Sequence, residues 1–124
     1  MNPERCPCGS GDTYDACCGR LHRGEAAAAT PEQLMRARFS GFAVGEVDFL
    51  LRSWHPDTRP ATLELDREQQ WTRLEVLSSS GGLFDPRGEV DFRAHYRRGD
   101  ERGVLEEHSR FVREDGTWLY LDGF

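Results

Sequence analysis

Apolar positions recur every three or four residues between residues 31 and 44, which is the spacing of an amphipathic helix. Thr30 is a suitable N-cap, Pro31 fits the first helical position, and Gln33 can complete a capping box. Gly45 is expected to end the helix. The stripe that should face a core consists of Leu34, Met35, Arg38, Phe39, Phe42 and Ala43.

A second set of apolar residues with helical spacing predicts another helix over 47–54: Val47, Leu50, Leu51 and Trp54. This helix should stop at His55, because Pro56 disfavours helical backbone in the residue before it. A short third helix is expected over 63–70. The first half of the chain is therefore predicted to be helical.

After residue 70 the apolar positions alternate instead, which is typical of strands with one buried face. The Asp115-Gly116 pair predicts a two-residue hairpin turn, and Gly- and Pro-containing loops separate the other strands. Strands are expected over 71–78, 89–97, 104–113 and 117–122. Helices followed by an antiparallel meander predict an α+β domain with the helices on one face of the sheet.

Composition adds a soluble, single-domain expectation. The 124 residues are 37% hydrophobic and 31% charged, with no apolar run of the roughly 20 residues that a membrane span needs. No signal peptide is apparent at the start, so a cytoplasmic location is expected. The net charge of −6 argues against a global field that attracts nucleic acid. All 16 basic residues are arginines, and they are interpreted as a solvated surface.

Four cysteines, all near the N-terminus, carry the clearest chemical signal. Cys6, Cys8, Cys17 and Cys18 follow a C-x-C-x8-C-C pattern, which suits either two disulfides or a four-thiolate zinc site. A reducing compartment and the strained bridges that adjacent cysteines would need favour zinc, one structural ion per chain. A short helix over 12–18, capped by Ser10 or Asp12, should return the second pair of ligands to the first.

The segment 1–24 is too short to bury a core, so metal binding should provide its folding energy. Residues 31–124 should fold independently, and Cys8→Ser should leave most of the thermal transition intact. His22 is interpreted as a surface histidine rather than a ligand.

Cys6-Pro7-Cys8-Gly9-Ser10-Gly11, Tyr14 and Cys17-Cys18-Gly19 resemble the SEC-C zinc motif, which is named for the tail of the SecA translocation motor. The resemblance extends to the YchJ-like family of small bacterial proteins through motifs in the rest of the chain: Leu34-Met35-Arg36-Ala37-Arg38-Phe39, Trp54-His55-Pro56, Glu107-x-Ser109-Arg110-Phe111 and Trp118-x-Tyr120-x-Asp122-Gly123. It implies a SEC-C motif over 1–24 and an NTF2-like domain over 25–124, a cone of helices on a curved sheet. It supplies no catalytic residues.

The cone is the place where a further site is conceivable. Counting from the Asp115-Gly116 turn, Ser109 should face Asp122, with one face formed by Glu107, Ser109, Phe111, Trp118, Tyr120 and Asp122. His55, Glu107 and Asp122 are the candidate acid–base residues. We expect them not to converge, because large aromatic side chains should fill the cone and the carboxylates should bind arginine, Ser109 or backbone.

The sequence therefore favours a zinc-binding adaptor without catalytic residues that binds a protein or ribosome-associated partner and not a membrane. A small-molecule binder or enzyme that uses the cone is the alternative. A third interpretation is nucleic-acid binding through residues around the cysteines: Arg5, Arg20, Arg23 and His22.

Overall fold

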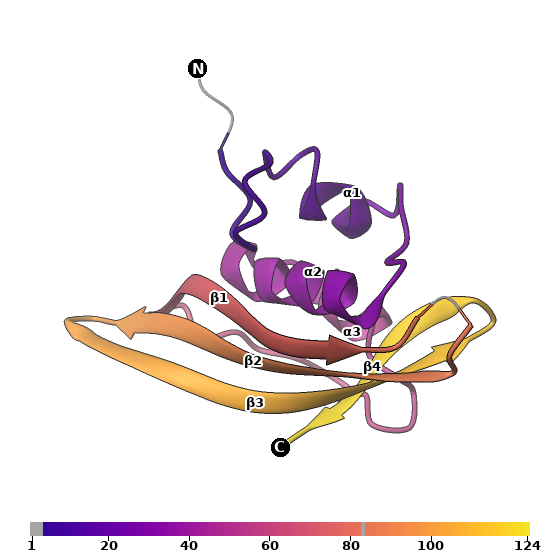
Figure 1. The fold of residues 1–124 in the computed structure, drawn as a ribbon. Helices are drawn as coiled ribbons and strands as arrows, with labels where there is room; N and C mark the ends of the chain where they lie inside the picture. The colour runs from indigo at the N-terminus through magenta and orange to yellow at the C-terminus, as the bar shows by residue number, and fades with distance from the viewer. Residues whose placement is uncertain (1–3, 83) are drawn as a thin grey trace.

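The computed structural model describes residues 4–82 and 84–124 and is α+β, as predicted. Three helices, α1 (Cys18–His22), α2 (Pro31–Val44) and α3 (Val47–Arg52), precede an antiparallel sheet with the strand order β1-β2-β3-β4. Its strands are β1 (Gln69–Ser80), β2 (Arg87–Arg98), β3 (Glu101–Glu114) and β4 (Thr117–Gly123). The sheet is curved, α2 lies across one face of it, and α1 lies on the far side of α2 (Figure 1). In the described residues, no helix is long and apolar enough to cross a membrane.

The predicted ends of α2 are confirmed. The Thr30 hydroxyl accepts the Gln33 amide at 3.1 Å, and the Gln33 side chain accepts the Ala29 amide at 2.7 Å. Pro31 opens the helix, and Gly45 ends it with a φ of 82°. Because both caps are local, the sequence specified them without help from the rest of the fold.

α3 ends two residues earlier than the predicted helix, because the chain after it pairs with β4. Trp54 forms a parallel bridge with Tyr120. The Tyr120 amide donates to the Ser53 carbonyl at 2.8 Å, and the His55 amide donates to the Tyr120 carbonyl at 2.7 Å. Residues 53–55 therefore cover one edge of the sheet through their backbone pairing with Tyr120.

Two of the predicted helices are wrong. Residues 59–68 contain no helix; instead the Asp66 carboxylate accepts the Glu68 amide at 3.0 Å in a turn that leads into β1. Residues 12–17 form turns, and the N-terminal helix begins only at Cys18, with Cys17 as an N-cap that makes no side-chain hydrogen bond. Short segments of this kind rarely form helices, because nucleating a helix is costly.

The strands lie where expected but are longer, so the loop between β1 and β2 covers only residues 81–86. β1 carries two irregularities in its pairing with β2, one between Trp71 and Arg73 and one between Val76 and Ser78. The turn at Asp115-Gly116 has positive φ at both residues, 52° and 79°, as a two-residue hairpin requires. β1 is a free edge of the described sheet.

The register of the last hairpin was predicted in part. Phe111 faces Tyr120, as expected, but a bulge follows. It places Asp122 opposite Arg110, and Ser109 opposite Gly123. The prediction that Ser109 faces Asp122 is therefore wrong, and Asp122 lies on the outer face of the sheet, away from α2.

The core lies between α2 and the inner face of the sheet and continues into the N-terminal segment. Leu34 and Phe39 of α2 meet strand residues such as Phe92 and Trp118. The same cluster contains four residues of the N-terminal segment, Cys6, Cys8, Cys18 and Leu21. The segment before α2 therefore shares one continuous core with the helix and the sheet.

Candidate functional site

The four cysteines lie together in a geometry that suits a metal ion. Their Sγ atoms all lie within 4.8 Å of one another, and none is in a disulfide. Cys8 Sγ is 3.7 Å from Cys17 Sγ, which in turn is 4.0 Å from Cys18 Sγ. A tetrahedral ion with metal–sulfur bonds of ~2.3 Å needs sulfur–sulfur separations of about 3.8 Å. The cluster therefore fits a four-coordinate metal with only small shifts of the sulfur atoms that lie farthest apart.

The loop before Cys17 brings the first pair of cysteines to the second. The Cys6 amide donates to the Asp12 carbonyl at 2.9 Å, which closes the loop. Gly9 and Gly11 sit at φ values of 83° and 91°, which few other residues adopt without strain. The Ser10 hydroxyl lies 3.2 Å from Cys17 Sγ. The glycines of this segment are therefore required by the backbone that surrounds the cluster.

The thiols of the cluster share a negative charge unevenly. A hydrogen bond from the Cys18 thiol lowers the pKa of Cys8, so Cys8 is the thiol of the cluster that loses its proton most readily. The same hydrogen bond, and burial, raise the pKa of Cys18, and burial raises that of Cys17. A soft cation would replace the shared protons and make all four sulfurs thiolates.

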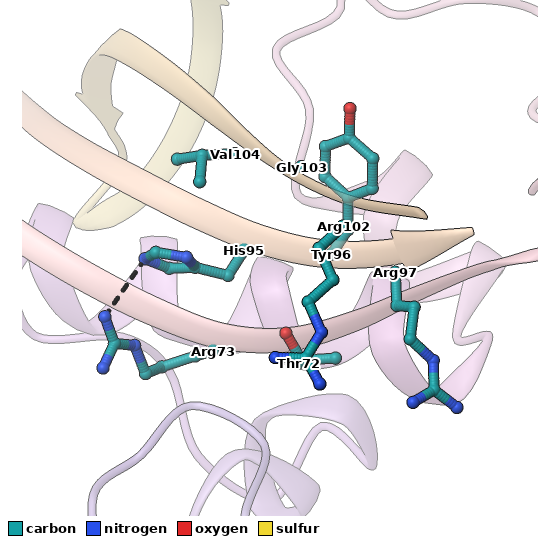
Figure 2. A pocket seen from close by; sticks show the side chains of 8 residues that line it. All are labelled: Thr72, Arg73, His95, Tyr96, Arg97, Arg102, Gly103 and Val104. Atoms are coloured by element: carbon teal, nitrogen blue, oxygen red, sulfur yellow. Dashed lines mark hydrogen bonds between the residues drawn. The ribbon is translucent and has the colours of Figure 1, made fainter. Parts of the chain in front are cut away.

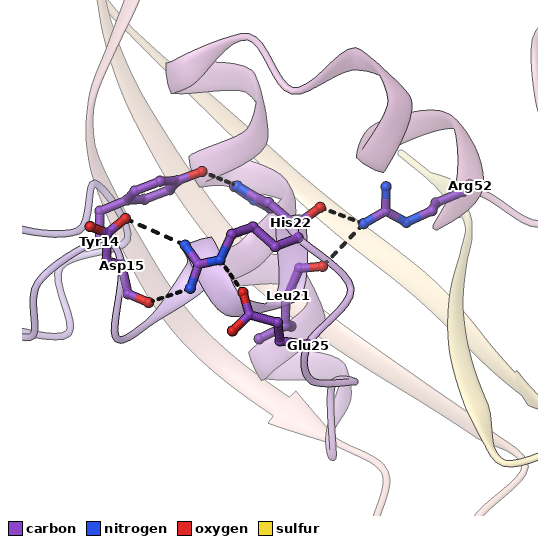
Figure 3. Close-up of polar contacts among 7 residues, drawn as sticks. Tyr14, Asp15, Leu21, His22, Glu25 and Arg52 are labelled. Carbon is purple, nitrogen blue, oxygen red and sulfur yellow. Dashed lines mark hydrogen bonds and ion pairs between the residues drawn. The ribbon is translucent and has the colours of Figure 1, made fainter.

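The N-terminal segment is fastened to the helices beneath it, mainly through His22 (Figure 3). His22 is buried, not on the surface as expected: its Nδ1 accepts the Tyr14 hydroxyl and its Nε2–H donates to the Ala37 carbonyl at 2.8 Å. Its ring lies 4.6 Å from that of Phe49, and burial lowers its pKa. His22 is therefore an uncharged side chain that connects the cysteine segment to α2 through its two hydrogen bonds.

Two arginines strengthen the same attachment. Arg52 of α3 donates to the carbonyls of Leu21 and His22, at 3.1 and 2.7 Å (Figure 3). Arg36 of α2 donates to the Cys8 carbonyl at 2.8 Å. The cysteine segment is thus bound to α2 and α3 by charged donors as well as by the shared core.

The candidate acid–base residues lie at three separate places. His55 is buried, accepts the Asp57 amide at its Nδ1 and lies 2.7 Å from a Glu114 carboxylate oxygen through Nε2. Glu107 lies on the inner face of β3 and accepts the Ser109 hydroxyl at 2.9 Å. Asp122 is on the outer face, where Arg110 donates to it from Nε at 2.6 Å and lowers its pKa. These three side chains therefore share no common point.

We expect His55→Ala to lower the free energy of unfolding by about 1–2 kcal/mol, because it removes two hydrogen bonds at a buried position. Urea unfolding followed by fluorescence checks this value. Glu114→Gln, which keeps an acceptor for His55 Nε2–H, is the matched control and should lose less. A loss of stability as small as the control's would contradict a structural role for His55.

The expectation that side chains fill the cone is wrong. A cavity of about 280 Å³ remains between α2, the end of α3 and the inner face of β1–β4. Aromatic side chains pack edge to face around it, as Phe39 and Trp71 do at a ring separation of 6.2 Å.

The residue that sequence reasoning missed in this cavity is Arg38. Its side chain is 3% exposed, and its Nη1 donates to the Leu50 carbonyl and the Ser53 hydroxyl, at 2.8 and 2.7 Å. The signal was present: a charged residue stands within the apolar stripe of α2. A charged residue at a core position indicates that a polar group is needed inside the cone.

A second hollow, of about 420 Å³, lies at one end of the sheet's outer face (Figure 2). Arg97 of β2 lies directly opposite Arg102 of β3, and Arg73 and His95 lie beside them. In Figure 2 the Arg97 and Arg102 side chains extend in one direction and the Tyr96 ring in the other. Sequence reasoning treated these arginines as separate surface charges, because their cross-strand pairing was not known.

Comparison with known proteins finds matches that together cover nearly the whole chain. The family model described as "YchJ, middle NTF2-like domain" matches residues 30–123, and the SEC-C motif matches residues 3–20. A UPF0225 protein of Streptomyces coelicolor is 52% identical over 124 residues, covering 99% of this chain and 97% of the relative. One of Corynebacterium efficiens is 52% identical over 120 residues, covering 96% of this chain and 92% of the relative.

Two solved structures have the same fold. The solution structure of a SEC-C motif containing protein from Rhodopseudomonas palustris has a TM-score of 0.86 at 36% identity, covering 100% of this chain and 98% of that one. The crystal structure of a SEC-C motif containing protein from Psychrobacter arcticus has a TM-score of 0.78 at 26% identity, covering 94% and 80%. With an N-terminal SEC-C motif and an NTF2-like domain that both match family models, the chain belongs to the YchJ-like, UPF0225 family.

Proposed function

We propose that this protein is a zinc-stabilised adaptor that binds an acidic segment of a partner protein through the arginine groove. The arginine groove is the hollow lined by Arg73, Arg97 and Arg102, together with His95. The zinc ion has a structural role, and no chemical step is assigned to it. Binding of the partner is the function.

Zinc is proposed because the donor set consists of four sulfurs. Soft thiolates select soft or borderline metals, and zinc adopts the tetrahedral arrangement that the sulfur separations fit. Four protein ligands leave no open position, which is typical of structural rather than catalytic zinc. The free thiols suit a reducing compartment such as the cytoplasm.

Protein purified without added metal should contain about one zinc ion per chain, the stoichiometry of one four-ligand site. Elemental analysis measures the metal, and titration with a mercurial reagent measures how many thiols react as zinc is released. We expect four thiols that react only as zinc is released. A metal-free protein with four reactive thiols, or one loaded with iron, would contradict zinc as the resident ion.

The observation that supports the adaptor function is the pair of arginines that face each other across β2 and β3. Like charges directly opposite on neighbouring strands destabilise a sheet. Neither Arg97 nor Arg102 makes an ion pair with any residue in the described ranges 4–82 and 84–124. Glu75, the nearby acid, already binds Arg73 and His95. An external carboxylate would relieve the repulsion between the two arginines.

The rest of the outer face favours a short acidic peptide over a nucleic acid. Farther along the strands, acidic side chains share this face with their own basic partners: Glu106 pairs with Arg93, and Asp91 with His108. A long polyanion lying along the face would be repelled by these carboxylates and by the net charge of −6 of the chain. The exposed Val104 beside the arginines adds an apolar contact that a peptide can use.

A fluorescein-labelled decaglutamate peptide is a suitable probe, with a decauridine RNA of similar charge for comparison. We expect anisotropy titrations at low salt to show peptide binding that the Arg97→Gln/Arg102→Gln variant weakens about tenfold, which is ~1.4 kcal/mol. Arg20→Gln/Arg87→Gln carries the same change in charge at sites outside the groove and should change affinity little. Equal losses in both variants, or tighter binding of the RNA, would overturn the proposal.

A further inference from the structure

We propose that the cavity inside the cone binds a small apolar molecule with a single carboxylate, and that Arg38 is the partner of that carboxylate. This inference is independent of the arginine groove, because the cavity lies on the opposite, inner face of the sheet. It concerns a ligand of the fold's interior, whereas the adaptor function concerns its surface.

The residues that line the cavity favour a ligand that is mostly apolar. Most of the lining side chains are aromatic or aliphatic, and they come from α2 and from three strands: Met35, Phe39, Phe42, Trp71, Phe92 and Leu105. At about 30 Å³ for each displaced water, the 280 Å³ cavity has room for roughly ten non-hydrogen atoms. A mostly apolar cavity with a few convergent polar groups is the usual form of a small-molecule site.

Arg38 provides an incompletely satisfied positive charge. Nη1 is fixed by Leu50 and Ser53, but Nε and Nη2 make no hydrogen bond within the described part of the chain. The guanidinium carbon lies 4.4 Å from the centre of the Tyr120 ring and 4.9 Å from that of Trp54. These two rings hold the guanidinium flat, which leaves its remaining donors in the orientation that a carboxylate accepts.

Glu107, the acidic residue of the cavity wall, lies near enough for its charge to favour the cationic form of Arg38 but does not bind it. Glu107 makes no ion pair with Arg38; it accepts the Ser109 hydroxyl. Its carboxyl packs on Gly123, where an added Cβ would lie 2.5 Å from the Glu107 carboxyl carbon. Glu107 therefore lies close against β4, and its charge would repel a second carboxylate on a ligand. This arrangement favours monocarboxylates over dicarboxylates.

A second polar group of the cavity wall also lacks a partner. Among the described residues, Trp54 Nε1 is the one fully enclosed side-chain nitrogen or oxygen without a hydrogen bond, whereas the unpaired donors of Arg38 keep some accessible surface. An unpaired buried donor costs roughly 1–3 kcal/mol. Trp54 stacks beside the Arg38 guanidinium, but its Nε1 is covered by protein atoms and does not open into the cavity, so Arg38 is the donor that a ligand carboxylate would meet. The two unused donor groups of Arg38 indicate an anionic group of the ligand at this end of the cavity.

The test compares three probes by isothermal titration calorimetry on the full, metal-loaded chain: 3-phenylpropionate, its uncharged analogue 3-phenylpropan-1-ol, and adipate, a dicarboxylate small enough for the cavity. We expect 3-phenylpropionate to bind at least about tenfold more tightly than the alcohol and the dicarboxylate. Quenching of tryptophan fluorescence should accompany binding, because Trp54 and Trp71 line the cavity. Equal affinity for acid and alcohol, or no heat with any probe at millimolar concentration, would overturn the proposal.

Two variants locate the binding. Arg38→Gln should remove the preference for the acid over the alcohol, provided that circular dichroism shows a folded protein. Leu105→Trp keeps Arg38 and fills the mouth of the cavity, so it should abolish binding of both probes. Leu77→Trp adds the same side chain at an exposed position of β1 outside the cavity and should bind as the parent does. Unchanged binding by Leu105→Trp would place the ligand elsewhere and overturn the proposal.

Discussion

Replacing Cys8 with serine is expected to release the metal and to lower the melting temperature of the whole chain by roughly 10 °C. The core of the helix and sheet continues into the cysteine segment through Cys6, Cys18 and Leu21. Loss of the cluster would also weaken the hydrogen bonds of His22 and the contact of Arg36 with the Cys8 carbonyl. Together these losses amount to about 3 kcal/mol, which leaves α2, α3 and the sheet folded but less stable.

This result differs from the one that the sequence suggests, in which the cysteine segment unfolds while the main transition stays intact. Differential scanning calorimetry of parent and variant distinguishes the two. Ser10→Ala is the control, because Ser10 is exposed and the substitution removes its hydroxyl but keeps its backbone hydrogen bond to Cys8. A main transition that Cys8→Ser leaves unchanged, with hydrogen exchange increased only before residue 25, would show that the segment is energetically separate.

The second large effect is expected for Gly88→Ala, at the point where α2 rests on the sheet. A Cβ at Gly88 would lie 2.5 Å from the Ser80 carbonyl oxygen and would collide with the ring of Pro31. The first neighbour is strand backbone and the second is a rigid ring in the first turn of α2, so neither can yield easily. We expect the free energy of unfolding to fall by about 3 kcal/mol, because the helix must lift from the sheet.

Urea unfolding measures this loss, and Gly82→Ala provides the matched comparison. At Gly82, in the adjoining loop, the nearest atom to an added Cβ is an Asp85 carboxylate oxygen at 3.6 Å, an ordinary contact. Its effect should stay within about 0.5 kcal/mol. If Gly88→Ala proved as stable as Gly82→Ala, the close approach of Pro31 to β2 would be wrong.

The parts of the fold that sequence predicted are those specified by neighbouring residues. Thr30 and Gly45 bound α2, and Asp115-Gly116 makes its hairpin turn, because each needs only a local backbone conformation. The bulge that moves Asp122 to the outer face was not predictable in this way. It accompanies contacts from distant segments, since Tyr120 also pairs with residues 53–55 and the Phe124 backbone pairs with His108.

The same distinction between local and distant contacts separates the candidate sites that could be predicted from those that could not. The cysteine cluster could be predicted because its four ligands lie within 13 residues of sequence and their spacing carries the chemistry. His22 and Arg38 were missed because their roles depend on which distant segments of the chain pack against α2. Arg97 and Arg102 became a site only when the register of β2 and β3 placed them opposite each other.

The two irregularities in β1 bear on how copies of the chain behave at high concentration. β1 is a free edge of the described sheet along its whole length, and at 12 residues it would be a long template for strands of other molecules. The extra residue at each irregularity bends the strand and interrupts the even row of backbone donors and acceptors. The charged side chains of Arg73 and Glu75 between them also oppose stacking of identical edges. The free edge is therefore shaped against edge-to-edge aggregation, while residues 53–55 shield the edge at β4.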